Sequence, residues 1–398
     1  AGTNAAFTNV SGNIIPYFNP TDAGGWTNDV NFGQRPFSYT PPTGFVRLNT
    51  YNLPDSTIKK GNTVMDATLY TGTSSAQSIT NAAGFKPDLI WGKARSTTRF
   101  NVLVDSVRGS SKDLYSNSTS AEYTDANVIS SINSNGFSLG TDAELNLSAN
   151  TFVAWQWQAG QGSTTTGTGT GGITSVTQSV NATAGFSIVT YTGSGTAGTV
   201  THGLGVAPKW VIVKARSAAG ENWQVYSSSL TSAAYRMRLN ATDAQDSQPT
   251  MWNSTAPTST VFSVGTASGV NTSAVTYVAY CWAEIAGFSK FGSYTGNGST
   301  DGTFVYTGFR PSYILLKRTD AANIWLIGDS KRDGYNSANP SANKQLQAQA
   351  TNAESNFDID YLSNGFKLRN TDSYLNASGG TYIYMAFAEN PFKNSLAR

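Results

Sequence analysis

The chain has very few residues of the two types that most often carry metal or nucleophilic chemistry. Of its 398 residues, one is cysteine and one is histidine. Cys281 has no second cysteine to pair with, so an intramolecular disulfide is excluded, and it is interpreted as a small buried hydrophobe. Zinc sites need several Cys or His ligands, so none is expected. A Ser-His-Asp triad would have to use His202, which lies in a glycine-rich turn and is interpreted as structural.

Charged residues and long apolar runs are also scarce. Asp, Glu, Lys and Arg make up 13% of the chain, about half the usual share, and the formal net charge is +2. This balance gives no indication of nucleic-acid binding, and no apolar run reaches the roughly 18–20 residues of a membrane span. Glycine, serine, threonine and asparagine are abundant instead, and 12% of the residues are aromatic. This composition is typical of β-rich, turn-rich extracellular or virion proteins.

One pattern occurs three times along the chain. Each copy opens with Tyr-Thr-Gly, continues with an apolar strand led by proline, and closes with a strand that starts Thr-aromatic. Tyr70 to Tyr191 and Pro87 to Pro208 both span 121 positions, and the intervals to Tyr294 and Pro311 both span 103. A solenoid repeat has only roughly 20–50 residues, so each copy matches a complete small domain.

The short strands, closed by Gly, Asn, Asp and Pro, predict an all-β fold. We expect three tandem jelly-roll-like β-sandwich repeats, at residues 61–160, 173–286 and 287–398. A Gly/Thr-rich, flexible linker is expected at residues 161–172. Residues 1–60 are not part of the repeat and are expected to be a partial β-sandwich. Residues 341–350 are the best helix candidate, as one or two turns or a loop.

The second and third copies contain further motifs, which are Ala184-Gly185-Phe186-Ser187-Ile188, Gly292-Ser293-Tyr294-Thr295-Gly296, Ser363-Asn364-Gly365-Phe366-Lys367 and Ala386-Phe387-Ala388-Glu389-Asn390. These motifs resemble C-terminal modules of structural and tail-fibre proteins in tailed bacteriophages, notably marine and cyanobacterial phages. The run Asn31-Phe32-Gly33-Gln34-Arg35-Pro36-Phe37 resembles the last core strand of SPRY domains, which are concanavalin-like β-sandwiches, and covers only the end of that fold.

The resemblance implies a virion location, on the tail or the capsid exterior, and extracellular when the protein is released. It implies a tail-fibre or tail-associated adhesin that binds a glycan or protein of the host surface. Expected partners are other virion proteins and copies of the chain itself, as a homo-oligomer that is a trimer if the protein is a fibre. The alternatives are a capsid decoration or architectural protein without receptor binding, a glycan depolymerase, and a cellular surface or filament-forming protein with these modules.

A depolymerase would need two carboxylates roughly 5–10 Å apart. Asp358 and Asp360 share one face of a predicted strand, but a solvated face is the favoured interpretation. We therefore expect no enzyme and no cofactor. Four aspartates of the third copy have oxygen ligands that calcium accepts, but they follow no calcium-loop pattern, so no metal site is predicted. They are Asp301, Asp320, Asp329 and Asp333.

Residues that recur between copies are interpreted as structural. Asp105 with Arg108 recurs as Asp329 with Arg332, and is interpreted as an ion pair or turn bond that fixes a loop. Recurring tryptophans, Trp223 and Trp325, are interpreted as packing. Aromatic residues that do not recur, in turn-like segments among Ser, Asn and Gly, are the candidates for stacking on sugar rings. These candidates are Trp26, Tyr235, Trp252 and Tyr374.

Overall fold

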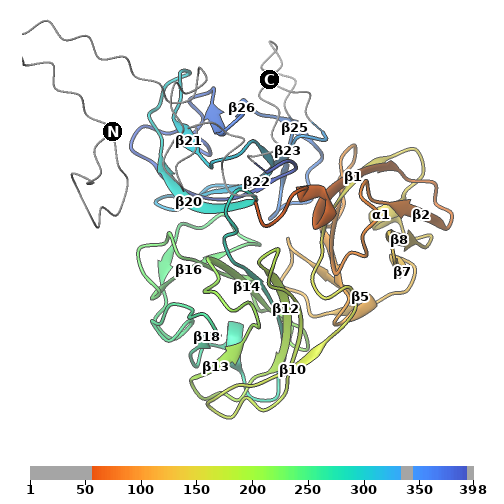
Figure 1. Ribbon diagram of the computed structural model, residues 1–398, viewed down its shortest axis with the longest axis vertical. Coiled ribbons are helices and arrows are strands. Elements are labelled where there is room, and N and C mark those ends of the chain that lie inside the picture. Colours follow the sequence, from red (N-terminus) through yellow and green to blue (C-terminus); the bar gives the residue numbers. More distant parts are fainter. Residues whose placement is uncertain (1–55, 333–343, 392–398) are drawn as a thin grey trace, which may run out of the picture. The chain divides into compact units, whose positions relative to one another are not determined.

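The structure is a computed structural model that describes residues 56–332 and 344–391 (Figure 1). In these residues the regular structure is almost entirely antiparallel β-sheet, so the prediction of an all-β, sandwich-type fold is confirmed. The helical exceptions are single turns at Gly61–Thr63, α1 (Ala143–Asn146) and α2 (Ser268–Asn271). Nearly all of the predicted SPRY-like segment, including the candidate Trp26, lies outside the described residues.

The first module has a six-stranded sheet and a three-stranded sheet. The larger sheet has the order β1 (Met65–Thr71), β9 (Thr151–Trp157), β3 (Leu89–Ala94), β4 (Val102–Asp105), β5 (Gly109–Tyr115), β6 (Tyr123–Thr124). The smaller sheet has the order β2 (Gln77–Thr80), β8 (Gly136–Leu139), β7 (Ile129–Asn133). The closing strand β9 therefore lies between the opening strand β1 and the proline-led strand β3.

The second module repeats this order. Its larger sheet is β10 (Thr165–Gly167), β11 (Val176–Asn181), β12 (Phe186–Thr192), β19 (Thr276–Trp282), β14 (Trp210–Ala215), β15 (Gln224–Ser227), β16 (Tyr235–Arg238), β17 (Asp246–Ser247). Its smaller sheet pairs β13 (Gly198–Thr201) with β18 (Val261–Val264).

The first two strands of this larger sheet correct one expectation. The segment at 161–172 contains β10, which pairs with β11, and Gly169 forms a bridge with Val200. The segment therefore extends the sheet of the second module and is not simply a flexible linker. Its Gly/Thr composition indicated flexibility, but the neighbouring edge strand supplies backbone partners for it.

The third module has the same strand order again. Its larger sheet is β20 (Ser289–Thr295), β28 (Thr381–Ala388), β22 (Pro311–Arg318), β23 (Trp325–Asp329), β24 (Lys344–Gln347), β25 (Ser355–Asn356). Its smaller sheet is β21 (Phe304–Tyr306), β27 (Gly365–Leu368), β26 (Ile359–Leu362). The helix candidate at 341–350 is wrong over its described residues, because β24 pairs with β23 there. The sheet partner outweighed the helix propensity of the local sequence.

The closing strands are buried on both faces, because they serve two different apolar cores. In β9, Phe152 and Ala154 belong to the interior of the first module. Val153, Trp155 and Trp157 point to the other face and belong to a cluster shared by all three modules. The ring of Trp157 contacts Trp282 of the second module and Tyr313 and Phe387 of the third. The three modules therefore form one unit around a common core.

Candidate functional site

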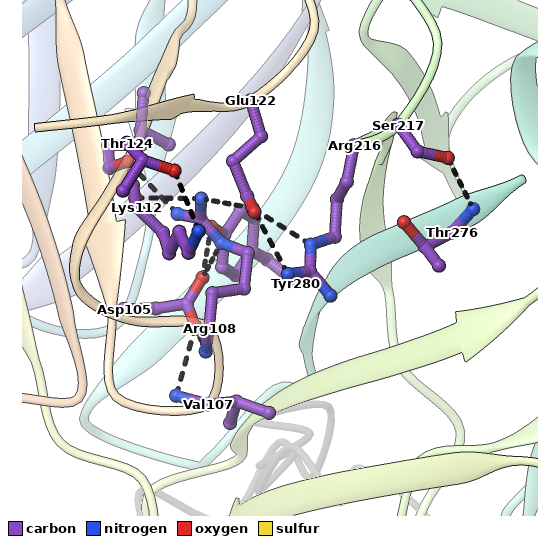
Figure 2. Close-up of polar contacts among 11 residues, drawn as sticks. Asp105, Val107, Arg108, Lys112, Glu122, Thr124, Arg216, Ser217, Thr276 and Tyr280 are labelled. Atoms are coloured by element: carbon purple, nitrogen blue, oxygen red, sulfur yellow. Dashed lines mark hydrogen bonds and ion pairs between the residues drawn. The ribbon is translucent and has the colours of Figure 1, made fainter.

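A buried, strongly polar site lies where the first module meets the second (Figure 2). Asp105 ends β4, and Arg108 lies in the turn that leads to β5. The Arg108 Nε is 2.5 Å from the Asp105 Oδ2, and both side chains are completely buried. Asp105 Oδ1 accepts hydrogen bonds from the backbone N–H groups of Val107 and Arg108. The pair fixes this turn, as the sequence predicted.

Three further side chains complete the site, and two of them come from the second module. Tyr280 of β19 donates from its hydroxyl to Asp105 Oδ2, at 2.7 Å. Glu122 accepts from Arg108 Nη1, at 3.1 Å, and from Arg216 Nε of the second module, at 2.8 Å. We call these five residues the Asp105 network.

The protonation states in this network follow from burial and from the neighbouring charges. Burial by itself would lower the pKa of Arg108, but Asp105, Tyr280 and Glu122 together raise it more, so the guanidinium stays charged. Burial by itself would raise the pKa of Glu122, but hydrogen bonds from Arg216 and the charge of Arg108 lower it overall. Burial raises the pKa of Tyr280 well above its ordinary value, so its hydroxyl keeps the proton that it donates. Each charge has a partner, so the arrangement holds the first and second modules together and has a structural role.

The same arrangement occurs where the third module meets the first. Arg332 Nε is 2.6 Å from Asp329 Oδ2, and Arg332 Nη1 is 3.1 Å from Glu354 Oε1. Trp155 of the first module donates from Nε1 to Asp329 Oδ2, at 2.9 Å. Arg95, also from the first module, is 3.0 Å from Glu354. Trp155 therefore takes the role of Tyr280, and Arg95 that of Arg216.

The third interface, between the second and third modules, has lost the whole set. Ser227 is the last residue of β15, just as Asp105 is the last residue of β4. The position of Arg108 is held by Leu230, and Met385 of β28 replaces Tyr280. Leu230 and Met385 both belong to the shared apolar core. The charged pair and the donor that reaches it are absent together, which avoids an unpaired buried charge.

One set of backbone contacts is common to all three interfaces and closes them into a cycle. The first module contacts the second, the second contacts the third, and the third contacts the first. In each case a backbone N–H donates to the carbonyl of the residue just after the proline-led strand of the next module. These bonds are Glu122 to Arg216 at 2.8 Å, Gln245 to Thr319 at 2.9 Å and Glu354 to Arg95 at 2.7 Å.

A buried lysine recurs at each of these contacts. In every module the proline-led strand carries one lysine whose Nζ donates to a backbone carbonyl of the neighbouring module. The bonds are Lys93 to Ala350, Lys214 to Thr119 and Lys317 to Thr242. Burial lowers the pKa of Lys93 and Lys317 to about 7, and that of Lys214 to about 8. Sequence reasoning missed these lysines, although their recurrence was a readable signal.

The predicted sugar-stacking candidates lie in different places. Trp252 is 2% exposed and packs in the core of the second module, so its ring face is not available. Tyr235 of β16 is partly buried against the shared core. Tyr374 is partly buried and its hydroxyl donates to Asp372, at 2.7 Å. The described residues show no hydrogen bond or ring contact that joins two of these candidates.

The other residues singled out by the sequence have structural contacts. His202 is buried, its Nε2 is 3.1 Å from the Thr258 carbonyl oxygen, and burial lowers its pKa. Trp223 and Trp325 are buried, as predicted, and each donates from Nε1 to a backbone carbonyl of the preceding module. Cys281 is buried in the core of the second module. Within the described residues, no group of three or more His, Cys, Asp or Glu side chains is arranged to hold a metal ion.

The chain belongs to a protein family described as a domain of unknown function (DUF7483), whose model matches residues 60–391. No curated protein and no solved structure matches the chain. Within the described residues, no helix is long and apolar enough to span a membrane. The family match runs across all three modules without interruption. The family unit is therefore the assembled set of modules and not a single copy.

Proposed function

We propose that this member of the DUF7483 family is a structural protein of a tailed-phage virion, and serves as a tail-fibre or tail-associated adhesin. The observation that carries the proposal is the closed cycle of contacts between its modules. The hydrogen bonds and ion pairs of the Asp105 network and of its counterpart around Asp329 join one module to the next. A unit held together in this way presents its loops and sheet faces in fixed positions, which suits a protein on the exterior of a virion.

The state of the polar groups favours binding over catalysis. Tyr280 and His202 are buried, and each has a hydrogen-bond partner. Asp360, one member of the candidate carboxylate pair, is engaged by Arg369. The Tyr280 and His202 side chains are therefore committed to structural contacts, and Asp360 has a cation beside it, so an adhesive or architectural role is the better fit.

The closed cycle also bears on self-association. The faces through which the modules contact one another are used within a single chain. The homo-oligomer that we propose therefore forms through other surfaces. Several copies on one virion would make weak contacts with a host surface effective, because binding of the first copy raises the local concentration of the next.

The test is binding of the fluorescently labelled full chain to intact cells of candidate bacterial hosts, with surface-polysaccharide mutants of the same strains as controls. Saturable binding that is lost in the mutants is the expected result for a glycan-binding adhesin. Saturable binding that persists in them would mean a protein receptor. Binding to no host would overturn the adhesin role and leave an architectural or decoration role. Loss of polysaccharide viscosity on incubation would instead indicate a depolymerase.

A further inference from the structure

The smaller sheet of the third module carries two exposed aromatic side chains on one face. Phe304 is 42% exposed and Tyr306 is 62% exposed, while Val305 between them is buried in the module. Successive residues of a strand point to opposite faces of its sheet, so both rings lie on the outer face. Exposed apolar side chains that lie together on one face mark an interaction site more often than single scattered ones do, so this pair of rings points to a ligand.

The strand register shows which side chains lie beside these rings. Lys367 of β27 pairs with Phe304 on one side and with Asp360 of β26 on the other, and these three form one row across the sheet. Tyr306, Gly365 and Leu362 form the second row. We call these six residues, with Asp301 and Arg369 beside them, the outer face of module 3.

The other two modules provide an internal comparison for this face. At the same positions of the first module, every side chain is small and polar or absent. The rows there are Ser78, Ser138 and Ser131, and Thr80, Gly136 and Asn133. In the second module the positions of Phe304 and Tyr306 are held by Thr199 and Thr201. The scaffold therefore does not need aromatic residues at these positions, and they serve a purpose particular to the third module.

The missing side chain of Gly365 makes part of this face flat. A Cβ atom at Gly365 would lie 2.1 Å from the Val305 carbonyl oxygen and 2.9 Å from the Phe304 ring. The ring of Phe304 therefore lies over the backbone of Gly365. An aromatic ring that lies flat beside a glycine is a suitable surface for stacking a planar or saturated ring.

The polar groups of the outer face carry no net charge. Asp301 is 2.5 Å from Lys367 Nζ and 3.5 Å from Arg369 Nη1. Arg369 Nε is also 2.5 Å from Asp360 Oδ2. Two cations are thus balanced by two carboxylates, and exposed pairs of this kind are weak enough to exchange partners. Such a face favours a neutral, hydroxyl-rich ligand over a polyanion or a polycation.

We propose that the outer face of module 3 binds a neutral carbohydrate chain. The C–H face of a sugar ring stacks on Phe304 and Tyr306, and its hydroxyl groups exchange hydrogen bonds with Arg369 and Asp360. This inference rests on the proposed adhesin function, for which it supplies the binding surface and the ligand class. Phe304 and Tyr306, whose rings are exposed, thus take the place of the buried Trp252 as candidates for stacking on sugar rings.

The experiment measures retardation of the full chain in native gels that contain one polysaccharide each: mannan, galactan, glucan or, as an acidic comparison, alginate. The test variant F304S/Y306T gives the third module the residues that the first module has at those positions. The matched control is Y123S, which removes Tyr123, an aromatic residue of the first module that is 48% exposed. We expect retardation by a neutral polysaccharide, at least tenfold weaker binding in F304S/Y306T, and binding within twofold of the parent in Y123S. Binding should persist in 0.5 M NaCl, because the ligand is neutral.

Retardation by none of the neutral polysaccharides would overturn the inference, as would retardation by alginate alone or an unchanged affinity of F304S/Y306T. If the double variant unfolds, the single variant Y306T decides, because its side chain is the more exposed. The cell-binding assay separates this inference from the proposed function. Cells that bind the parent and F304S/Y306T equally would overturn the binding surface and leave the adhesin role intact. Cells that bind neither would overturn the adhesin role, while the gels would still decide whether the surface binds sugar.

Discussion

The hydroxyl of Tyr280 reaches the buried carboxylate of Asp105 from a different module and donates a hydrogen bond to it, at 2.7 Å. Where the equivalent donor is the indole of Trp155, the carboxylate is also present, as Asp329. Where the equivalent residue is Met385, which has no donor, the carboxylate is replaced by Ser227. The three interfaces of one chain thus show that the buried acid and its donor occur together.

Replacing Tyr280 by Phe should destabilise the protein by about 1–3 kcal/mol, because Asp105 loses a donor while it remains buried. The free energy of unfolding from urea titration measures this change. Tyr123→Phe is the matched control, since Tyr123 is 48% exposed, and it should change the stability by less than about 0.5 kcal/mol. Equal stability of Y280F and Y123F would contradict the role of the hydroxyl.

Replacing Asp105 alone should lower the stability more than replacing Asp105, Arg108 and Tyr280 together. Asp105→Ser leaves the guanidinium of Arg108 buried with only Glu122 as a charged partner, and should cost about 3–5 kcal/mol. The triple variant D105S/R108L/Y280M copies the residues of the third interface into the first. It should be more stable than D105S by at least about 1 kcal/mol. If the triple variant is less stable than D105S, the three positions are not coupled as we describe.

The stability of the protein should depend on pH through Asp113. Neither carboxylate oxygen of this buried residue has a hydrogen-bond partner among the described residues. Burial raises its pKa to about 7; Arg108 opposes the shift, while Asp125, Asp142 and Glu122 add to it. Between about pH 4 and pH 7, Asp113 is protonated in the folded state but ionised in the unfolded chain. The contribution of Asp113 to stability therefore falls as the pH rises through this range.

The variant D113N removes this titration and serves as the test. Urea midpoints of the parent and the variant should be compared at pH 4, 6 and 8, so that effects of other groups cancel. The free-energy difference should move in favour of D113N by about 4 kcal/mol between pH 4 and pH 8. A difference that stays constant with pH would mean that Asp113 has the same pKa in the folded and unfolded states.

A single module should not fold on its own. In isolation, residues 161–286 would expose Trp210, Tyr280 and Trp282, which are buried in the shared core. We expect this fragment to lack a cooperative thermal transition, and residues 56–398 to unfold in one transition. Calorimetry and near-ultraviolet circular dichroism measure both. A fragment with a sharp transition of its own would show that the shared core is dispensable for its folding.

The repeat in the sequence was sufficient to predict the three copies and their all-β character. The period of about one small domain, the proline-led strands and the recurring Thr-aromatic strands can all be read along the chain. The recurring Asp105 and Arg108 pair was also readable, because both residues lie within three positions of each other. Local contacts of this kind leave a local pattern, which the third copy repeats as Asp329 and Arg332.

The partners of that pair were decided only by the tertiary structure. Tyr280 lies 175 positions from Asp105, and Trp155 lies 174 positions from Asp329. Along the sequence both look like ordinary core aromatics of a closing strand. Apolar residues at successive positions of these strands indicate that both faces are buried, but they do not indicate what covers the second face. The way in which the modules pack made that face a shared core, closed the cycle of interfaces, and left the aromatic outer face of module 3 exposed.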